Sequence, residues 1–592
     1  MPLLSKTDFI LGQDCLAKLF LKRNGFPSNK SEDLYLQSLA KMGHLVGKIA
    51  QIQFGPGQIS EMARDPQDAV ESTRDWLSQN VEGTLFEATF SADGCYARVD
   101  VLVKNGDSIQ LIEVKSAGIN EDQKQNRRRF SRDFDSKLND LTFQYLVALS
   151  QYPEYSFTPH LALMDKGVQN NITSLFKRFS VLNQPNVGNY QGFNVLYTGN
   201  EEALAELQLL HVEPCIDMVN ARIDSVDKDR QAFVQAYQDL NNFENFKSPL
   251  GSHCAGCEFR TTPIVGSGFH HCWGERAMQT PHILSVAKDA HFSKLVTECI
   301  HQGGSTIQDI PLESMYNNKG IERVNGRPIY QRNQEHEVIL PELFHEISNL
   351  NYPLFFVDFE TIRSAIPFHS GQYPYDIELF QWSVHKLSEP SGNLEHFEYL
   401  NEVYQNPNDT FISTLREVIG DEGTVLTWSS YENTQIKNYL ENLQADRDDV
   451  DHDLANWLLS ILKDRDGGRR QVDMHDDWIR PYYYHQLMGG RTSIKVVLPA
   501  ILSENQPSKN IALLSELGLY SVNEEGQPLD PYKLLDGISD GTKAMQAYEQ
   551  LITHEAINAH HEELIKQGLL AYCRLDTLSM VLIYNYLISK AS

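Results

Sequence analysis

The spacing of apolar side chains changes along the chain, and each change predicts a different kind of element. From the N-terminus to about residue 80, apolar residues recur at helical intervals, as in Leu16, Leu19 and Phe20. This spacing places the side chains on one face of a helix. The first segment is therefore predicted to be helical.

From Thr84 the pattern becomes typical of strands. Three runs rich in β-branched and aromatic residues cover Phe86 to Phe90, Cys95 to Val103 and Ser108 to Lys115. Turn-forming residues separate the runs, as strands of a meander require. A helix is predicted over residues 138–150, and further helices over residues 204–246 after mixed segments.

The second half of the chain repeats this change from helices to strands. Residues 280–345 are weakly patterned and are predicted to be a helical connection. Apolar strand patterns then cover residues 354–359, 379–386, 396–400 and 424–428. Helices follow, and the last of them, over residues 569–587, is long and amphipathic.

Length and composition fit a multidomain α/β protein. A chain of 592 residues with 41% hydrophobic and 22% charged residues exceeds the size of a single core and is ordinary for globular proteins. We expect three parts, 1–275, 276–348 and 349–592. The chain lacks an apolar run long enough for a membrane span and an N-terminal signal pattern, so we expect a cytoplasmic protein without membrane contact.

The first candidate site contains Asp100, Glu113 and Lys115. Asn105-Gly106 predicts a two-residue turn that pairs Val103 with Ser108 and places Asp100 opposite Leu111. Glu113 would then lie diagonal to Asp100 on one face, roughly 7–8 Å away, with Lys115 beside it.

These three residue types favour phosphodiester hydrolysis. Two carboxylates can hold Mg²⁺ while leaving positions for water and phosphate, and a lysine can orient that water or neutralise developing charge. A hairpin whose charged face simply meets solvent is the alternative that spacing alone leaves open.

An aspartate followed by Glu113-Val114-Lys115 at a strand end resembles the RecB-like branch of the PD-(D/E)xK nuclease superfamily. The resemblance implies a restriction-endonuclease-like fold, a histidine metal ligand on an upstream helix and a glutamine on a downstream helix. His44 and Gln144 stand at the matching positions. The family often has a tyrosine four residues after the glutamine, where this chain has Ala148.

A cysteine-rich segment follows this region. Cys254 and Cys257 have metal-knuckle spacing, and Cys272 follows. With His253, His270 or His271 as a fourth ligand, the segment would suit zinc. Buried thiols are the other interpretation, and for Cys95, Cys215, Cys299 and Cys573 burial is the one we prefer.

The cysteines also resemble those of RecB-like nucleases of the CRISPR-adaptation and helicase-associated types. These hold an iron–sulfur cluster with one cysteine upstream of the nuclease core and three downstream. The resemblance implies a [4Fe–4S] cluster on Cys15, Cys254, Cys257 and Cys272 that staples the two ends of the domain together. We prefer it to zinc.

The second candidate site contains acids from distant segments. Asp358 and Glu360 alternate at the end of a buried strand and so share a face. On the last helix, Tyr572 and Asp576 are four residues apart and also share a face. A polar pair within an otherwise apolar helix needs a partner.

This arrangement resembles the DEDD exonucleases of the RNase H-like fold, in their tyrosine subclass. The resemblance implies four acids that hold two Mg²⁺ or Mn²⁺ ions and a tyrosine, here Tyr572, that positions the attacking water. Glu432 would be the acid of the second motif, with Asp473 as its competitor.

Residues from about 350 to 590 are also similar to a bacterial family of unassigned function that is predicted to be RNase H-like. Its marks include Phe380-Gln381-Trp382-Ser383 and Tyr572-Cys573-Arg574-Leu575-Asp576-Thr577. Fusion of that segment to a RecB-like nuclease is an arrangement known in the family.

The net charge of −28 is unusual for an enzyme of nucleic acids, because phosphate contacts are the usual source of affinity. Positive charge is nevertheless concentrated at Arg127, Arg128 and Arg129, and Lys495 is a further candidate for phosphate contact. A solvated helix face and pairing with local acids are equally good interpretations of these side chains.

The sequence thus predicts a metal-dependent nuclease with two active sites that acts on DNA rather than RNA, in repair, end processing or antiviral defence. One alternative is a 3′→5′ exonuclease of RNA or single-stranded DNA with only the C-terminal site active. Another is a non-catalytic scaffold stabilised by metals. The chain has no helicase P-loop, so unwinding would require a helicase or another protein in trans.

Overall fold

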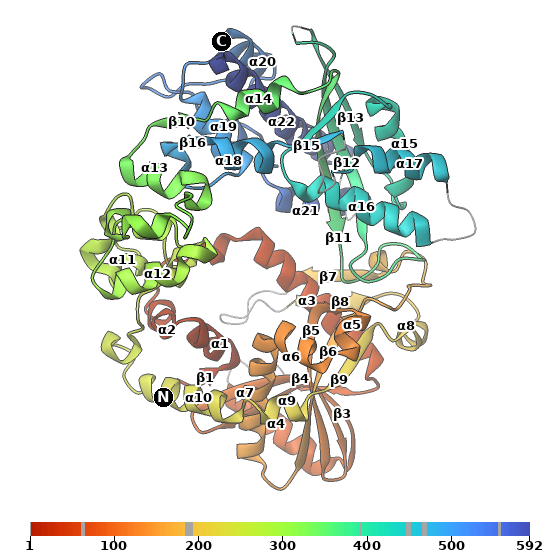
Figure 1. Ribbon diagram of the computed structural model, residues 1–592. Coiled ribbons are helices and arrows are strands. Elements are labelled where there is room, and N and C mark those ends of the chain that lie inside the picture. The colour runs from red at the N-terminus through yellow and green to blue at the C-terminus, as the bar shows by residue number, and fades with distance from the viewer. Residues whose placement is uncertain are drawn as a thin grey trace. The chain divides into compact units, whose positions relative to one another are not determined.

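The computed structural model describes residues 2–60, 66–183, 193–390, 392–445, 451–463, 470–553 and 558–591, which form a mixed α/β protein (Figure 1). Its contacts divide into two compact units. The N-terminal unit comprises Met1–Pro249, Gly256–Gly274 and Arg363–Asp376. The C-terminal unit comprises Leu250–Ala255, Glu275–Ile362 and Ile377–Ser592.

The segment up to about residue 80 is mainly helical, as predicted, although its described part also contains two short strands of the first sheet. The helices are α1 (Lys6–Asp14), α2 (Leu16–Arg23), α3 (Leu34–Gln53) and α4 (Pro66–Gln79). Side-chain caps fix two of the starts, because Ser5 accepts a hydrogen bond from the Asp8 amide and Asp33 accepts one from the Tyr35 amide.

Seven of the described strands form the N-terminal sheet, in the order β2-β3-β4-β5-β6-β9, with β1 paired to β4. The strands are β1 (Leu4–Ser5), β2 (Gln58–Ile59), β3 (Glu82–Ala92), β4 (Cys95–Asn105), β5 (Ser108–Ile119), β6 (Ser156–Asp165) and β9 (Leu210–Pro214). The three predicted strands are β3, β4 and β5, each longer than its apolar run. A separate hairpin joins β7 (Phe179–Asn183) to β8 (Phe193–Tyr197).

The predicted register of the β4–β5 hairpin is wrong by two residues. Asn105 pairs with Ser108, so the loop is Gly106-Asp107 rather than Asn105-Gly106. Gly106 adopts φ +62 at the first loop position, where a type II′ turn requires glycine. A shift of two residues keeps every side chain on its face, but it moves Asp100 level with Glu113 instead of diagonal to it.

One segment predicted as helix contains a strand. Within residues 204–246, Leu210–Pro214 forms β9, which pairs antiparallel with β6. Pairing to the sheet thus overrides the local pattern at this edge. The remaining helices of the unit are α5 (Glu121–Gln125), α6 (Arg127–Asp133), α7 (Asp135–Gln151), α8 (Glu201–Leu207), α9 (Ile216–Asn220), α10 (Ile223–Ala236) and α11 (Gly268–Trp273).

Helix α7 packs on the sheet and fixes the N-terminal core. Its Phe143 is fully buried and stacks on Phe9 of α1, with ring centroids 4.7 Å apart. Phe90 of β3 and Leu111 of β5 belong to the same buried cluster. The first helix, the sheet and α7 therefore share one core, which holds the ends of β4 and β5 in place.

The segment predicted as a helical connection is mainly helices and short turns within the C-terminal unit. Its helices are α12 (Ala290–His301), α13 (Arg327–Asn333) and α14 (Glu342–Ser348). It also contains a short strand, β10 (Glu337–Ile339), which pairs antiparallel with β16 (Tyr483–His485).

The C-terminal sheet has the strand order β13-β12-β11-β14-β15. Its strands are β11 (Leu354–Arg363), β12 (Ile377–Leu387), β13 (Leu394–Leu400), β14 (Thr424–Thr427) and β15 (Gln471–Asp473). The first four match the predicted runs. Strands β11, β14 and β15 are parallel, whereas β12 and β13 form an antiparallel hairpin.

The predicted last helix is present and longer than its pattern, as α22 (Ala559–Ala591). It packs against β12, where Gln381 donates a 2.8 Å hydrogen bond to the Leu569 carbonyl and Ser383 contacts Thr577 at 2.8 Å. The unit's other helices are α15 (Asn408–Ile419), α16 (Ser430–Ala445), α17 (His452–Ile461), α18 (Arg480–Tyr482), α19 (Ile494–Leu502), α20 (Ser508–Glu516) and α21 (Gly541–Thr553). In the described parts of the chain, every helix is too short or too polar to cross a membrane.

Candidate functional site

The N-terminal candidate site lies where β4 and β5 separate. Their ladder ends at the pair Val101 and Ile112. Beyond it, the Asp100 carboxylate accepts a 2.7 Å hydrogen bond from the Val114 amide. The Asp100 side chain thus replaces a backbone carbonyl as the partner of the Val114 amide, and the two strands separate beside Glu113.

Glu113 is the centre of a buried polar network. Its Oε1 accepts hydrogen bonds from Lys115 at 2.5 Å and from Lys6 at 2.8 Å. Its Oε2 accepts one from the Gln144 amide at 2.8 Å. The structure therefore brings together Glu113, Lys115 and Gln144, and it adds Lys6 of α1, which no sequence pattern marked.

Asp140 is a second residue that the sequence did not reveal. It accepts a 2.6 Å hydrogen bond from Lys115 and a 3.2 Å hydrogen bond from Gln144. Asp140 lies four residues before Gln144 on α7, so the two share one helix face. The sequence could have indicated Asp140, because it is an acid one helical turn before Gln144.

His44, Asp100 and Lys115 line one pocket, which we call the N-terminal pocket. Its volume is about 630 Å³, and α3, β4 and β5 supply most of its wall. Glu87 and Arg98, two charged residues that the sequence analysis did not select, also line it. The three predicted residues on this wall thus face a common space.

The two central carboxyls carry opposite pKa shifts. Burial and the neighbouring Glu113 raise the pKa of Asp100 well above its usual range. Burial also opposes ionisation of Glu113, but Lys115 and Lys6 outweigh it and hold the pKa of Glu113 below its usual range. A cation that binds Glu113 would have to displace at least one of these ammonium groups.

Packing around α2 bears on the predicted cysteine cluster. Cys15 stands between α1 and α2, Cys272 is on α11, and Cys257 and Cys272 both contact the N-terminal core. Three residues after Cys15, Lys18 forms a 2.7 Å ion pair with Glu258, the neighbour of Cys257. These contacts hold α2 against the segment that carries Cys257 and Cys272.

The fourth predicted ligand, Cys254, belongs to the C-terminal unit, and its Sγ lies 3.6 Å from the His253 ring. Each of the remaining thiols, Cys95, Cys215, Cys299 and Cys573, is buried, as we predicted.

Two of the predicted phosphate-binding arginines are engaged in ion pairs. Arg127 pairs with Glu213 at 2.8 Å, and Arg129 pairs with Asp122 and Asp133. Arg128 lies between them on α6 and is exposed. Local acids thus offset much of the positive charge that the sequence showed here.

The C-terminal candidate site is a group of three carboxylates, Asp358, Glu360 and Asp576, which we call the acidic group. Asp358 and Glu360 extend from β11, and Asp576 extends from α22. One oxygen from each lies within 4.8 Å of the others. Side chains from distant segments of the C-terminal unit thus converge, as the resemblance to DEDD exonucleases implied.

Tyr572 contacts a lysine whose charge acts on Glu360 and Asp576. Lys495 at the start of α19 donates hydrogen bonds to the Tyr572 hydroxyl at 3.0 Å and to the Ser539 carbonyl at 3.1 Å. Its ammonium lies 4.7 Å from the centre of the Tyr572 ring. Lys495 is therefore a member of this site.

Two further contacts hold the acidic group. Tyr532 donates a 2.5 Å hydrogen bond to Asp576, and the Cys573 thiol lies 3.3 Å from the Asp358 carboxylate. Tyr532 comes from a turn before α21, and its sequence context gave no signal. Cys573 directly follows Tyr572, so its place at the site could have been inferred from the helix.

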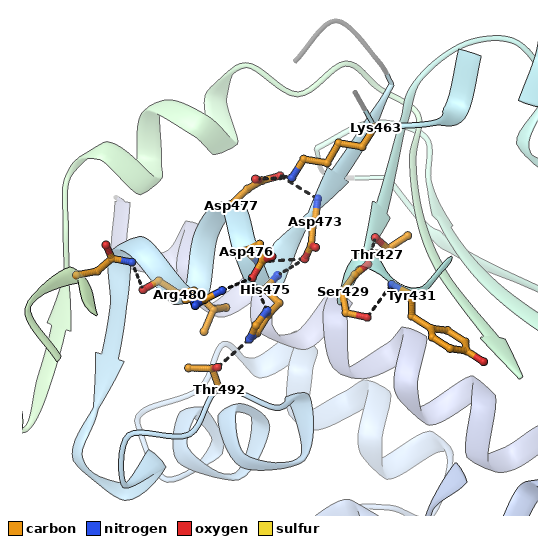
Figure 2. A network of polar contacts seen from close by, with 12 residues as sticks. Thr427, Ser429, Tyr431, Lys463, Asp473, His475, Asp476, Asp477, Arg480 and Thr492 are labelled. Carbon is orange, nitrogen blue, oxygen red and sulfur yellow. Dashed lines mark hydrogen bonds and ion pairs between the residues drawn. The ribbon is translucent and has the colours of Figure 1, made fainter. Parts of the chain in front are cut away.

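Glu432 lies near the acidic group, and Asp473 lies near Glu432 in a different environment. Glu432 is buried on α16, and its charge acts on Asp358. Asp473 ends β15 and caps the π-helical segment Met474–Ile479 by accepting hydrogen bonds from the His475 and Asp476 amides, both at 3.0 Å (Figure 2). Since those amides already occupy one Asp473 oxygen, Glu432 remains our preferred fourth acid.

Burial and mutual repulsion oppose ionisation of these carboxyls. Burial and Asp576 raise the pKa of Glu360 to about 8. Burial raises the pKa of Glu432 to about 8, with Asp473 and Asp576 adding to the shift. Three close carboxylates suit a divalent cation, which prefers oxygen ligands and would relieve this repulsion.

A second group with metal-ligand chemistry contains His336, His485 and Glu504. Both imidazoles contact the same Glu504 oxygen through Nε2, at 2.7 and 3.1 Å. The Nδ1 of His485 accepts a 3.2 Å hydrogen bond from the Leu487 amide, which places the proton of a neutral ring on Nε2. This tautomer suits a hydrogen-bonded cluster better than a metal centre.

Comparison with known protein families gives a match for one segment of the chain. Residues 355–493 match a family described as a domain of unknown function (DUF2779). The matched segment contains Asp358, Glu360, Glu432 and Asp473, and it ends before Tyr572 and Asp576. No curated protein and no solved structure matches the chain.

Proposed function

We propose that the protein is a divalent-metal-dependent nuclease with two active sites that hydrolyses phosphodiester bonds of DNA. In this proposal, residues 1–275 form a PD-(D/E)xK nuclease domain, and residues 349–592 form an RNase H-like exonuclease domain of the DEDD type. Residues 276–348 connect the two. The convergence of Asp358, Glu360 and Asp576 from β11 and α22 is the observation that carries the proposal.

At the C-terminal site, the acidic group and Glu432 would hold Mg²⁺ or Mn²⁺, which would activate the attacking water and stabilise the leaving oxygen. Tyr572 would orient that water through its hydroxyl. Lys495 contacts this hydroxyl and is placed to neutralise charge on the scissile phosphate. A strand end would be the substrate, with 3′→5′ removal of nucleotides.

At the N-terminal site, Asp100, Glu113 and His44 would hold a Mg²⁺ or Mn²⁺ ion that supplies the same activation of water. Lys115 would orient the water or neutralise charge that develops on the phosphorane, and its contact with Asp140 fixes its direction. Gln144 would hold Glu113 in place from the opposite oxygen.

A [4Fe–4S] cluster on Cys15, Cys254, Cys257 and Cys272 would hold the two ends of the N-terminal domain together, with Zn²⁺ as the alternative. Four thiolates are the donor set that either group prefers. The contact of Lys18 with Glu258 supports the approach of Cys15 and Cys257.

We further propose that the enzyme works in the cytoplasm on DNA rather than RNA, in repair, end processing or antiviral defence. Unwinding of duplex ends would come from a helicase or another defence or repair protein in trans. Arg127, Arg128, Arg129 and Lys495 would contribute phosphate contacts once their local ion pairs exchange for the strand.

Paired variants test the proposal. Lys115→Ala and Asp358→Ala should each leave a distinct residual activity on end-labelled DNA with Mn²⁺, and the double variant should be inactive. Full retention of activity in Lys115→Ala would instead establish the C-terminal site as the sole nuclease. A wild-type protein that digests neither DNA nor RNA with Mg²⁺ or Mn²⁺ would identify a scaffold.

A further inference from the structure

The N-terminal pocket contains an ion pair that the proposed chemistry does not use. Arg98 Nε lies 2.8 Å from Glu87 Oε2, and both side chains line the pocket together with Asp100 and Lys115. The two are neighbours across strands β3 and β4, and each is partly exposed, at 29% for Arg98 and 23% for Glu87. Both side chains are therefore partly accessible from the pocket.

The backbone at Glu87 has an uncommon conformation. Its φ is +59, in the left-handed region that non-glycine residues rarely adopt within a strand. The β3–β4 ladder pairs Phe86 with Val101 and Ala88 with Val99, so Glu87 lies level with Asp100. Such backbone strain is found preferentially at functional sites.

The direction of Arg98 follows from strand geometry. Along β4 the half-buried residues Tyr96, Arg98 and Asp100 alternate with the fully buried Ala97 and Val99. Residues two apart on a strand share a face and lie roughly 7 Å apart. The guanidinium thus extends from the same face as the Asp100 carboxylate, one side-chain position farther along the strand.

We propose that Arg98 binds the phosphate next to the scissile one, and that Glu87 is the positioning residue that holds the guanidinium on the pocket face. The inference rests on the proposed nuclease function of this pocket. An arginine suits the role because its planar fork binds a phosphate through two parallel hydrogen bonds.

The consequence for specificity is a requirement for two consecutive phosphates. Lys115 and Asp100 act at the phosphate that is cut, and Arg98 binds the adjacent phosphate. The substrate class is then a strand with at least two phosphodiester linkages. Compounds with a single phosphate, such as bis(p-nitrophenyl) phosphate, lack the contact and should react equally well without Arg98.

The test uses the full chain with Asp358→Ala, so that cleavage comes from the N-terminal site. Single-stranded DNA carrying one neutral methylphosphonate at successive positions is digested with Mn²⁺. With Arg98 present, one position beside the cut should slow cleavage roughly 10- to 100-fold, the size expected for hydrogen bonds to a charged group. Arg98→Ala should cut unmodified DNA more slowly by the same factor and lose the sensitivity at that position.

Two controls separate this role from a merely structural one. Arg74→Ala removes an exposed arginine of α4 and should leave the methylphosphonate profile unchanged. Glu87→Gln should raise KM more than it lowers kcat, because the guanidinium remains but is less well held.

Two results would overturn the inference. One is an Arg98→Ala enzyme that keeps the full sensitivity at every position. The other is an equal loss of activity on bis(p-nitrophenyl) phosphate and on DNA. An Asp358→Ala protein that cuts nothing, beside an active wild type, would overturn the proposed function of the N-terminal site and this inference with it.

Discussion

The Gln144 side-chain amide donates a 2.8 Å hydrogen bond to Glu113, a contact between α7 and β5 inside the N-terminal core. Lys6 and Lys115 bind the other Glu113 oxygen. Gln144 is a neutral partner, so its contact does not offset the negative charge of the Glu113 carboxylate. The position of Glu113 thus depends on Gln144 as well as on the two lysines.

Replacing Gln144 tests that dependence. Gln144→Ala removes a donor to a buried, charged acceptor, which costs about 1.5–3 kcal/mol. We expect cleavage by the N-terminal site, assayed in the Asp358→Ala background, to fall by roughly 10- to 100-fold. Gln125→Ala, on an exposed helix, is the control and should have no effect. Unchanged cleavage in Gln144→Ala would contradict the role of this contact.

The hydroxyl of Tyr572 provides a second prediction. Tyr572→Phe keeps the ring and removes the group that Lys495 binds. We expect 3′→5′ degradation by the C-terminal site, measured in the Lys115→Ala background, to fall at least about tenfold, with thermal unfolding changed by only a few degrees. Tyr584→Phe on the same helix, whose hydroxyl contacts Tyr352 at 2.6 Å, is the matched control. Equal losses in the two variants would indicate a structural effect only.

The raised pKa values predict how stability depends on pH. An exposed glutamate titrates near 4.5, whereas Glu360 and Glu432 titrate near 8 in the folded protein. Folding thus favours the protonated carboxyls, so their stabilisation is complete below the unfolded pKa and is lost as pH rises through about 8. In the presence of a chelator, we expect the unfolding temperature to decrease between pH 6 and pH 9.

Glu360→Gln should reduce this decrease, because the amide does not titrate. The exposed Glu417→Gln on α15 is the control and should reproduce the wild-type slope. Added Mn²⁺ should raise the unfolding temperature more at pH 8 than at pH 6, since the cation binds the ionised forms. Stability that is independent of pH in wild type would contradict the predicted direction.

The cysteines predict a cofactor that can be measured directly. Anaerobically purified protein should absorb visible light and contain iron, and Cys272→Ser should abolish both while lowering thermal stability. Cys299→Ser changes a buried thiol of α12 and should keep the iron. Zinc in place of iron would support the alternative metal, and a protein that contains neither would contradict a metal centre at these residues.

Much of the site could be predicted because its residues lie on regular elements. Strand alternation placed Asp358 with Glu360, and helix spacing placed Tyr572 with Asp576, before any tertiary contact was known. The predicted β4–β5 register was wrong, because Gly106 occupies the first position of the two-residue loop rather than the second. Because the error is two residues, every side chain remained on its predicted face of the sheet. Only the pairing changed, so that Asp100 lies opposite Glu113 instead of diagonal to it.

The unpredicted members depend on tertiary contacts. Lys6 reaches Glu113 from a helix more than 100 residues away, and Tyr532 reaches Asp576 from a turn without regular spacing. Neither position follows from local pattern. Strand β9 was missed for the same reason, since only its pairing with β6 distinguishes Leu210–Pro214 from the flanking helices.

The origin of Asp576 in α22 has a consequence during synthesis. A ribosome adds roughly 5–20 residues per second, so about 10–40 s separate Asp358 from Asp576. Throughout that interval, Asp358 and Glu360 lack the acid and the tyrosine that complete their site. Under the proposed function, C-terminal activity therefore begins only when α22 docks, whereas the residues of the N-terminal site are all synthesised before Asp358.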